Sequence, residues 1–391
     1  MEQNSSENHQ ENQIDYTLYS EQPEKLFPLA KERLYKNEFE EAIEILEQAI
    51  LFAVKKFGGE EKVQLAIFYQ KYADAVLKKL LHVNQDILNI DQNEVDEKSQ
   101  KNQDKENEKE EKTENKENDE GRKAGNEEIS DEQIVYDNLS AANFNLKTYL
   151  KEYDDKDPKT LDKEKIKYYL LLADNYNLFA TLEKLNSDFK KANLNYTLSI
   201  DISKKYDNRF SRNLAGLYFE QAQILDYDPK NCLLSLYKSK VIMEHHLSKE
   251  LEKINSNIKL IIDENDLDLK DLSYKDEKII QNDKVIHSEE MKTLAKNNCD
   301  IEEFVEIIKD LIIKIEDVVE ELKEYDLFLK TKAEMQKTKE NENKFNNNID
   351  LSKVPDITSD VKFISKKRKE PENSENDLEG LNKDQKMKKE I

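Results

Sequence analysis

The sequence contains no tryptophan, and it has only six glycines and six prolines among 391 residues. So few helix breakers, together with abundant Glu, Lys, Leu, Ile and Asn, favour an all-α protein. No apolar run approaches the roughly 18 residues that a membrane-spanning helix requires. The polar stretch at residues 1–11 lacks the apolar core of a signal peptide. We therefore expect a soluble, intracellular protein with no membrane partner.

Residues that usually carry metal or catalytic chemistry are also scarce. Cys232 and Cys299 are the only cysteines, and their separation fits neither a zinc site nor a disulfide framework. His245 and His246 are adjacent, so a helix would point them in different directions, which indicates packing rather than metal binding. The sequence has no glycine-rich phosphate loop, no nucleophile elbow and no His-Glu-x-x-His motif. We expect no enzymatic activity, no metal and no cofactor.

The charge of the chain is strongly negative, with 85 acidic against 62 basic residues and a net charge of −23. Binding to phosphates needs Lys and Arg to displace counterions, so direct binding to nucleic acid is not expected. An anionic chain attracts basic proteins instead.

The acidic residues are concentrated in a low-complexity tract, residues 91–132, which holds 17 acidic against 8 basic residues, a net charge of −9. Val95 and Ile129 are almost its only large apolar residues, so the tract buries too little surface to offset the entropy of ordering the chain. We expect it to be disordered and to attract a basic partner. The acidic residues that we assign to this partner are Asp104, Glu106, Glu108, Glu110, Glu111, Glu114, Glu117, Asp119 and Glu120. A neutral loop expansion is the alternative, since Asn, Lys and Ile are abundant throughout the chain.

Helical periodicity begins after residues 1–22, which are polar and expected to be flexible. Ala30 and Ala42 are twelve positions apart, and Leu46 and Ala49 follow Ala42 by four and seven positions. This spacing is typical of the antiparallel helix pair of a tetratricopeptide repeat, in which small residues let two helices approach and large ones fill the groove.

The same pattern recurs in three further pairs. The second has Tyr69, Tyr72, Ala73 and Leu77 before the tract and Ile134, Val135, Leu139, Ala142 and Leu146 after it; the third has Tyr176, Phe179, Ala180, Ala192, Tyr196 and Ser199; the fourth has Tyr218, Gln221, Ala222, Leu233, Tyr237 and Lys240. The tract is therefore predicted to interrupt the second repeat between its two helices. Four repeats exceed the roughly three that a solenoid needs to stabilise itself, and we assign the solenoid to residues 23–262.

Beyond the repeats, a helix is predicted to continue from Leu247 to Ile262. Residues 263–300 are polar and indicate a loop or a second insertion. Apolar residues then recur at gaps of three and four from Ile301 to Leu329, which predicts a long amphipathic helix. We assign residues 301–330 to a helix that caps the solenoid; a coiled coil that joins two copies into a homodimer is the alternative. Residues 331–391 are polar and expected to be disordered.

Lys366, Lys367, Arg368 and Lys369 form a compact basic cluster in the predicted tail. Such a cluster is typical of a nuclear localisation signal, which predicts an import receptor as a partner and the nucleus as the location. A solvated run of charges is the alternative, because lysine is abundant throughout the chain.

The first helices of the pairs form the inner face of a solenoid. Counted from the small packing residues, this face is predicted to include Gln70, Asp74, Asn177, Thr181, Phe219 and Gln223. Their mixture of amides, a hydroxyl, a carboxylate and an aromatic ring can hold an extended or helical peptide. Ordinary solvent-facing polarity is the alternative.

Together these features resemble the histone chaperone family named for the nuclear autoantigenic sperm protein, whose tetratricopeptide repeats are of the interrupted, or SHNi, type. The resemblance covers roughly residues 23–262, 300–330 and 365–372. The similar segments are Lys55 to Gly58 at the turn that leaves the first repeat, Asp131 to Leu139 after the insertion, Ile315 to Asp317 in the capping helix, and Lys366 to Pro371 at the nuclear signal. The departures are a short tract diluted by lysine, Leu233 and Lys240 where small residues are usual, and the added segment 263–300.

The resemblance implies a chaperone that binds the histone three–histone four pair, chiefly through histone three, and escorts it for nuclear import and chromatin assembly. It leaves open whether the centromeric variant or linker histone is bound, whether the protein shuttles through the cytoplasm, and whether it is a homodimer. Histones are rich in Lys and Arg, and a disordered polyanion can shield these charges while a rigid repeat face reads a specific segment.

Two other functions fit a helical repeat protein. A chaperone-docking adaptor would hold a terminal carboxylate with Lys and Asn on its first repeats, but Phe27 and Lys31 stand at the corresponding places. A scaffold for motor or signalling complexes would need neither the tract nor the basic cluster.

Overall fold

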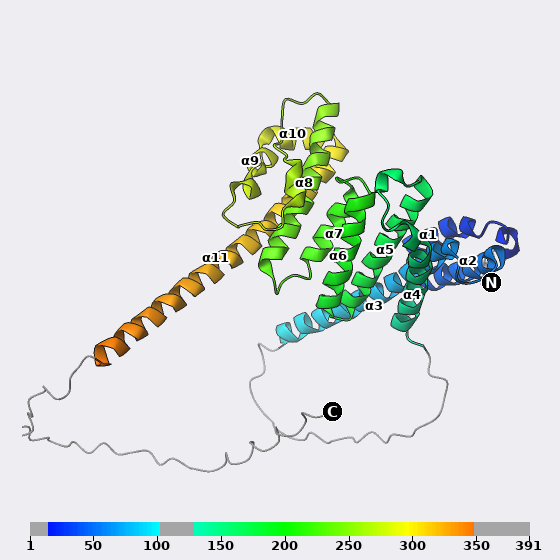
Figure 1. Cartoon of the computed structure of the whole chain (residues 1–391), viewed down its shortest axis with the longest axis horizontal. Helices are drawn as coiled ribbons and strands as arrows, with labels where there is room; N and C mark the ends of the chain where they lie inside the picture. Colours follow the sequence, from blue (N-terminus) through cyan, green and yellow to red (C-terminus); the bar gives the residue numbers. More distant parts are fainter. Residues whose placement is uncertain (1–14, 102–128, 348–391) are drawn as a thin grey trace, which may run out of the picture. The chain divides into compact units, whose positions relative to one another are not determined.

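The structure, a computed structural model, describes residues 15–101 and 129–347. Within these ranges every regular element is a helix and no strand occurs, so the all-α prediction is confirmed for them (Figure 1). The α-helices are α1 (Leu26–Tyr35), α2 (Phe39–Phe57), α3 (Ala66–Lys101), α4 (Asp131–Leu150), α5 (Lys163–Leu185), α6 (Phe189–Tyr206), α7 (Arg212–Ala222), α8 (Pro229–Lys253), α9 (Asp283–Ile286), α10 (Glu289–Asn297) and α11 (Cys299–Asn347). The short 3-10 helices are η1 (Tyr16–Tyr19), η2 (Pro23–Lys25), η3 (Val63–Leu65), η4 (Lys151–Tyr153), η5 (Pro158–Thr160), η6 (Glu264–Asp268) and η7 (Glu277–Ile280). The chain divides into two compact units, Met1–Phe328 and Leu329–Ile391.

The helices of the first unit pack as successive neighbours along the chain. Helix α1 packs against α2, α3 against α4, α5 against α6 and α7 against α8, and each pair contacts the next. The alanines that the spacing identifies lie at these contacts, and Ala30, Ala42, Ala180 and Ala192 are at most 2% exposed. Because an alanine side chain is small, neighbouring helices approach closely at these positions.

Turn residues and N-cap residues set where the first helix of a pair ends and the second begins. Asn37 between α1 and α2 has a φ of 59°, and Ser187 between α5 and α6 has a φ of 58°. This left-handed conformation lets a very short turn reverse the chain, and Asn adopts it more readily than most residues. The carboxylates of Asp188 and Asp228 then cap the N-termini of α6 and α8.

The acidic tract begins within a helix rather than at its end. Helix α3 continues to Lys101, so residues 91–101, which the sequence predicts to be disordered, are helical. They contain neither Gly nor Pro and include several good helix formers, so their composition allows the helix to continue. Helix α4 begins at Asp131, where the Ser130 side chain caps it. Helices α3 and α4 pack against each other although residues 102–128 separate them in the chain.

The helix predicted from Leu247 to Ile262 is shorter in the structure, because α8 ends at Lys253. Asn255 follows with a φ of 53°, a left-handed conformation that is typical of the residues that end helices. Beyond it the chain is extended, and Ile258 packs partly buried against the largest core.

Residues 263–300, which the sequence predicts as a polar loop or insertion, hold η6, η7, α9 and α10. Five of their apolar side chains are buried, whereas Ile280 is 59% exposed: Leu267, Leu272, Ile279, Ile286 and Met291 are at most 3% exposed. These residues join the core that contains α7 and α8. Their spacing follows neither a helical nor a strand period, so the sequence pattern does not reveal them.

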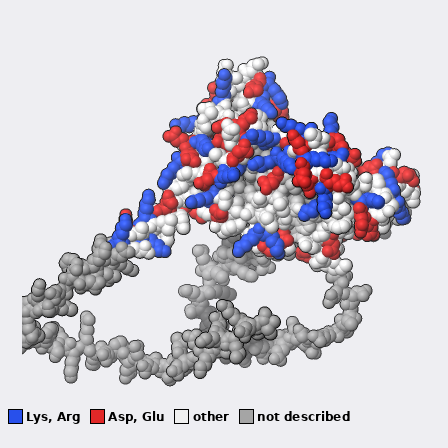
Figure 2. Space-filling model, viewed as in Figure 1, with Lys and Arg blue, Asp and Glu red and all other residues white. Residues whose placement is uncertain are grey.

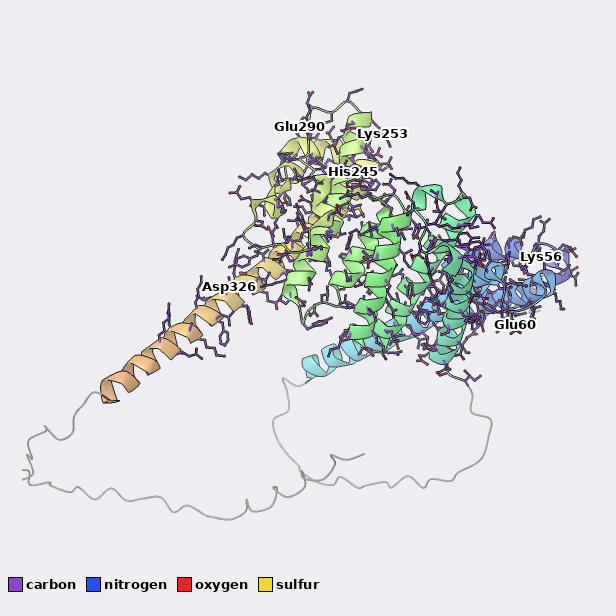
Figure 3. The ribbon with its side chains drawn as sticks, viewed as in Figure 1. Lys56, Glu60, His245, Lys253, Glu290 and Asp326 are labelled. Atoms are coloured by element: carbon purple, nitrogen blue, oxygen red, sulfur yellow. The ribbon has the colours of Figure 1, made fainter. Side chains whose placement is uncertain are left out.

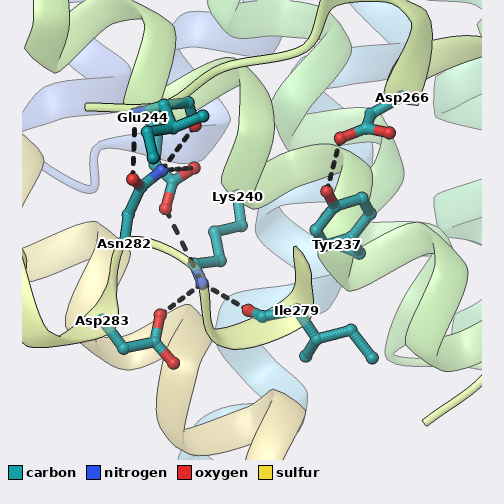
Figure 4. Close-up of polar contacts among 8 residues, drawn as sticks. Tyr237, Lys240, Glu244, Asp266, Ile279, Asn282 and Asp283 are labelled. Carbon is teal, nitrogen blue, oxygen red and sulfur yellow. Dashed lines mark hydrogen bonds and ion pairs between the residues drawn. The ribbon is translucent and has the colours of Figure 1, made fainter. Parts of the chain in front are cut away.

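A buried polar network attaches this segment to α8 (Figure 4). Lys240 is 1% exposed, and its ammonium group donates to the Ile279 carbonyl oxygen at 2.6 Å and to the Asp283 carboxylate. Glu244, one turn later on α8, has its Oε1 at 3.6 Å from Lys240 Nζ. Its Oε2 accepts a hydrogen bond from Asn282 Nδ2 at 2.9 Å. A buried ammonium group is stable only with partners of this kind.

Helix α11 carries the apolar stripe that the sequence predicts from Ile301 onward. The residues Ile301, Ile308, Leu311, Ile315 and Leu322 are at most 4% exposed and belong to the same core as α7 and α8. Over 301–322 the stripe is therefore buried within this chain, as a capping helix requires. Helix α11 continues to Asn347, so residues 331–347, which the sequence predicts to be disordered, are helical.

Candidate functional site

The residues that the sequence assigns to partners fall into two groups. The acidic residues from Asp104 to Glu120 and the basic cluster from Lys366 to Lys369 lie outside the described residues. All six inner-face residues are described: Gln70 and Asp74 lie on α3, Asn177 and Thr181 on α5, and Phe219 and Gln223 on α7 or its C-terminal cap. Helix α3 contacts α5, so the first two pairs of side chains belong to neighbouring helices.

On α3, the two predicted residues differ in how much surface they offer. Gln70 is only 5% exposed, and its Oε1 receives no hydrogen bond from any described residue. Because so little of it is accessible, Gln70 offers almost no surface to a partner. Asp74 is half-buried, and its Oδ2 accepts a hydrogen bond from Lys78 Nζ at 2.9 Å, one turn later on the same helix.

On α5, Asn177 and Thr181 are both half-buried. Thr181 Oγ1 donates to the Asn177 carbonyl oxygen at 3.0 Å, a bond within the helix that uses up the hydroxyl proton. No described residue forms a hydrogen bond with the Asn177 side-chain amide. Asn177 is therefore the inner-face amide with hydrogen-bonding capacity left for a ligand.

The α7 end of the face is partly covered by other parts of the chain, although Gln223 is exposed. Phe219 packs partly buried against the largest core, and Lys314 Nζ of α11 lies 5.6 Å from the centroid of its ring. Gln223 Oε1 accepts a hydrogen bond from Lys184 Nζ at 2.6 Å. Lys184 also pairs with Glu220 at 3.0 Å. Intramolecular contacts thus occupy this end, and the part open to a partner is narrower than the sequence predicts.

A groove of about 450 Å³ is lined by the start of α3 and the first half of α5, and none of the six predicted residues belongs to its lining. We call it the inner groove; its lining residues are Ile67, Lys163, Ile166, Lys167, Leu170, Leu171 and Asp174. The volume is in the range of sites that hold a few side chains or a small ligand. Its walls are largely apolar, with two cations toward one end and one carboxylate toward the other.

Asp174 is the carboxylate of the inner groove. Although part of its side chain is exposed, loss of surrounding water raises the pKa of Asp174 to about 6; Lys71 opposes the shift, and Asp207 and Asp74 add to it. A cation supplied by a partner would favour the ionised form and gain free energy from doing so. Asp174 therefore suits the inner groove to a Lys or Arg side chain, whereas Asp74 already pairs with Lys78.

Sequence periodicity missed the inner groove because the residues that it identified on the first helix of the third pair begin only at Tyr176. Helix α5 begins thirteen residues earlier, at Lys163. The Asp162 carboxylate caps its N-terminus by accepting a hydrogen bond from the Lys165 backbone N–H at 2.9 Å. Two signals were present in the sequence. Asp162 is a good N-cap residue, and Asp174 precedes Asn177 by three positions, on the same helix face.

The residues considered for metal binding have packing roles. His245 on α8 (Figure 3) stacks on Phe210 with ring centroids 3.8 Å apart, and His246 stacks on Phe304 at 5.6 Å. Residues 15–101 and 129–347 contain no group of three or more His, Cys, Asp or Glu side chains that could hold a metal ion. Cys232 is buried and free.

None of the helices in the described ranges has the length and apolar character needed to cross a membrane.

The surface of the described residues carries both signs of charge. Figure 2 shows Lys and Arg side chains interspersed with Asp and Glu over the visible face. No protein-family model matches the chain, and no curated protein shows significant similarity to it.

Proposed function

We propose that the protein is a non-enzymatic histone chaperone, which binds the histone three–histone four pair and escorts it for nuclear import and chromatin assembly. The observation that carries the proposal is the packing of α3 against α4 across residues 102–128. This intervening segment holds 11 acidic against 6 basic residues. The chain returns from this segment beside the middle of α3, where Asp131 pairs with Lys79 at 3.1 Å, so the anionic segment is inserted within one packed helix pair.

The succession of pairs supports a tetratricopeptide-repeat solenoid of the interrupted type. The pairs α1–α2, α3–α4, α5–α6 and α7–α8 follow one another in contact order, and small residues lie where the helices meet. Helix α11, buried along 301–322 against the core of the last pair, has the place of the capping helix. The solenoid would read one histone segment along the inner groove.

The charges suit a basic partner in two ways. The anionic segment between α3 and α4 attracts Lys and Arg through its net negative charge, which shields a histone from binding DNA elsewhere. Asp174, in the inner groove, offers a carboxylate for a single cation. The cluster from Lys366 to Lys369 supports import, because it is a run of four cations of the kind that import receptors bind.

Binding of purified histone three–histone four to the full chain tests the proposal directly. We expect deletion of residues 102–128, with a Gly/Ser linker in their place, to weaken binding about tenfold at low salt, because the diffuse electrostatic attraction is lost. The affinity of the variant should also fall less steeply as salt increases. A variant of unchanged length, in which every Asp and Glu of 102–128 is replaced by Asn or Gln, is the matched control for charge.

The two variants separate the possible outcomes. Equal weakening in both assigns the effect to charge, whereas unchanged affinity in both would show that the segment is only a loop. Circular dichroism checks that α3 and α4 still form. The main alternative is a repeat adaptor for other protein complexes. Recovery of heat-shock chaperones without histones in pull-downs from nuclear and cytosolic extracts would favour that alternative and overturn the proposal.

A further inference from the structure

A second groove, separate from the inner groove, is lined by α4, α5 and α6 and has a volume of about 450 Å³. We call it the aromatic groove. Its lining includes the aromatic side chains Tyr136, Phe144, Tyr176 and Phe179 and the charged side chains Lys147 and Glu183. None of these residues belongs to the predicted inner face.

Two aromatic side chains of the aromatic groove are exposed although α4 buries a separate apolar face within the chain. Helix α4 already buries one complete face, since Val135, Leu139, Ala142 and Leu146 are all 0% exposed. On its other face, Tyr136 is 48% and Phe144 57% exposed. Tyr136 meets Phe179 edge-on, with ring centroids 5.7 Å apart. A cluster of exposed aromatic side chains in a hollow is typical of a protein–protein interface.

The two charged residues lie toward opposite ends of the aromatic groove. Lys147 follows Tyr136 by eleven residues on α4, a rise of about 16 Å along a helix, and its Nζ lies 5.2 Å from the Tyr176 ring centroid. Glu183 lies one turn beyond Phe179 on α5, at the end where Tyr136 sits. The order along the groove is therefore a cation, the aromatic side chains and an anion.

Neither charge forms an ion pair within the described ranges. The nearest competitor for Glu183 is Lys191 of α6, which is already paired with Asp188 at 2.8 Å. No carboxylate of residues 15–101 or 129–347 lies within ion-pair distance of Lys147. Lys147 and Glu183 thus remain accessible to a partner at opposite ends of the groove, although Glu183 also attracts Lys191.

This order of charges is complementary to itself. If a second copy is turned by a two-fold axis through the middle of the groove, Lys147 of each copy faces Glu183 of the other, and the aromatic side chains meet at the centre. A basic partner would satisfy Glu183 and repel Lys147, and an acidic partner would do the reverse. We infer that the aromatic groove is an isologous self-association surface, whose occupant is a second copy of this chain.

The inference is independent of histone binding, and charge reversal tests it. Sedimentation velocity of the full chain over a concentration series, from about 1 to 100 μM, should show a monomer–dimer equilibrium. Lys147→Glu and Glu183→Lys, each alone, place like charges opposite each other twice, so each should raise the dissociation constant about tenfold or more. The double variant restores opposite charges and should regain dimerisation.

Mixing the two single variants gives the sharpest result. In a mixed dimer, the reversed charge at position 147 of one variant faces the reversed charge at position 183 of the other, and these two charges are opposite in sign. The unchanged Glu183 and Lys147 also face each other. A mixture should therefore dimerise where neither variant does alone, and this rescue is specific to a two-fold arrangement.

A substitution at the aromatic centre gives a test that does not depend on charge. Phe144→Ser should weaken the dimer without unfolding the chain, because that side chain is 57% exposed. Circular dichroism of the variant checks that its helices are retained.

Three results would overturn the inference. A full chain that stays monomeric over the whole concentration series would exclude self-association. Single and double charge variants that dimerise equally well would place the interface elsewhere. A Phe144→Ser variant that loses histone binding while the chain remains monomeric would show that the aromatic groove takes a partner instead of a second copy.

Discussion

Lys240 places an ammonium group in the core between α8 and the segment that carries α9. Its partners are Asp283, Glu244 and the Ile279 carbonyl oxygen. We expect Lys240→Ala to lower the free energy of unfolding by about 3–5 kcal/mol, because it leaves buried carboxylates without their cation. Urea unfolding followed by circular dichroism measures this change. Lys249→Ala, an exposed substitution on the same helix, is the matched control and should change the free energy by less than about 0.5 kcal/mol.

Glu244 makes the stability of this network depend on pH. Burial raises the pKa of Glu244 to about 7 from its ordinary value of 4.5, against the opposing effects of Lys240 and the Asn282 hydrogen bond, while Asp283 adds to the shift. The folded chain therefore holds this proton more tightly than the unfolded chain. As pH rises from about 4.5 to 7, the contribution of Glu244 to stability should fall by on the order of 1–3 kcal/mol, with no further loss above that window.

Unfolding of the full chain and of Glu244→Gln at several pH values measures that contribution. Glutamine cannot ionise, so the difference in free energy of unfolding between the two proteins should change in favour of the variant as pH rises through the window. A difference that stays constant between about pH 5 and pH 8 would show that Glu244 does not titrate there in the folded chain.

At the scale of single elements, apolar periodicity located the packed part of each helix but not its ends. Helices α3 and α11 continue to Lys101 and Asn347 because their last segments are rich in Glu, Lys and Gln, which favour a helix, and contain neither Gly nor Pro. Helix α8 stops at Lys253, well before Ile262, because Asn255 takes a left-handed conformation. The ends of helices depend on local backbone chemistry, which the spacing of apolar residues does not report.

The two departures from the repeat pattern near the C-terminus explain each other. Lys240 stands where a small residue is usual, and the segment 263–300 is an addition to the pattern. In the structure the long Lys240 side chain reaches the Ile279 carbonyl oxygen and Asp283 of that segment. Each departure alone is an interruption of the repeat pattern. The hydrogen bonds between Lys240 and the segment 263–300 show that the two pack together.

The inner face was predictable only in part. The helix positions of its six residues followed from counting, but their exposure depends on other elements. Lys314 of α11 covers Phe219, and Lys184 of α5 binds Gln223. These contacts join residues that are far apart in the chain, so the pattern of one helix cannot reveal them. The aromatic groove was missed for a related reason, because the sequence pattern was used to find the buried face of α4 and not its opposite face.

At the scale of the whole first unit, the buried residues form three successive clusters. Two of them lie between Leu26 and Leu182, and the third runs from Ala180 to Leu322. The third cluster joins α7, α8, the segment 263–298 and α11. In a repeat array each element is stabilised mainly by its neighbours. A truncation that destabilises the third cluster should therefore leave the other two clusters folded.

A chain that ends at Asn298 tests this division, because it removes α11 and so exposes the apolar side chains that α11 covers. We expect backbone amides of α8 and of residues 263–298 to exchange with deuterium at least about tenfold faster, because local unfolding there costs less free energy. Amides of α1 to α4 should exchange at rates within about twofold of those in the full chain, since their neighbours are unchanged. A chain that ends at Phe328, the last residue of the first unit, keeps the buried stripe and is the matched control. Faster exchange throughout α1 to α4 would instead show that the three clusters unfold as one cooperative core.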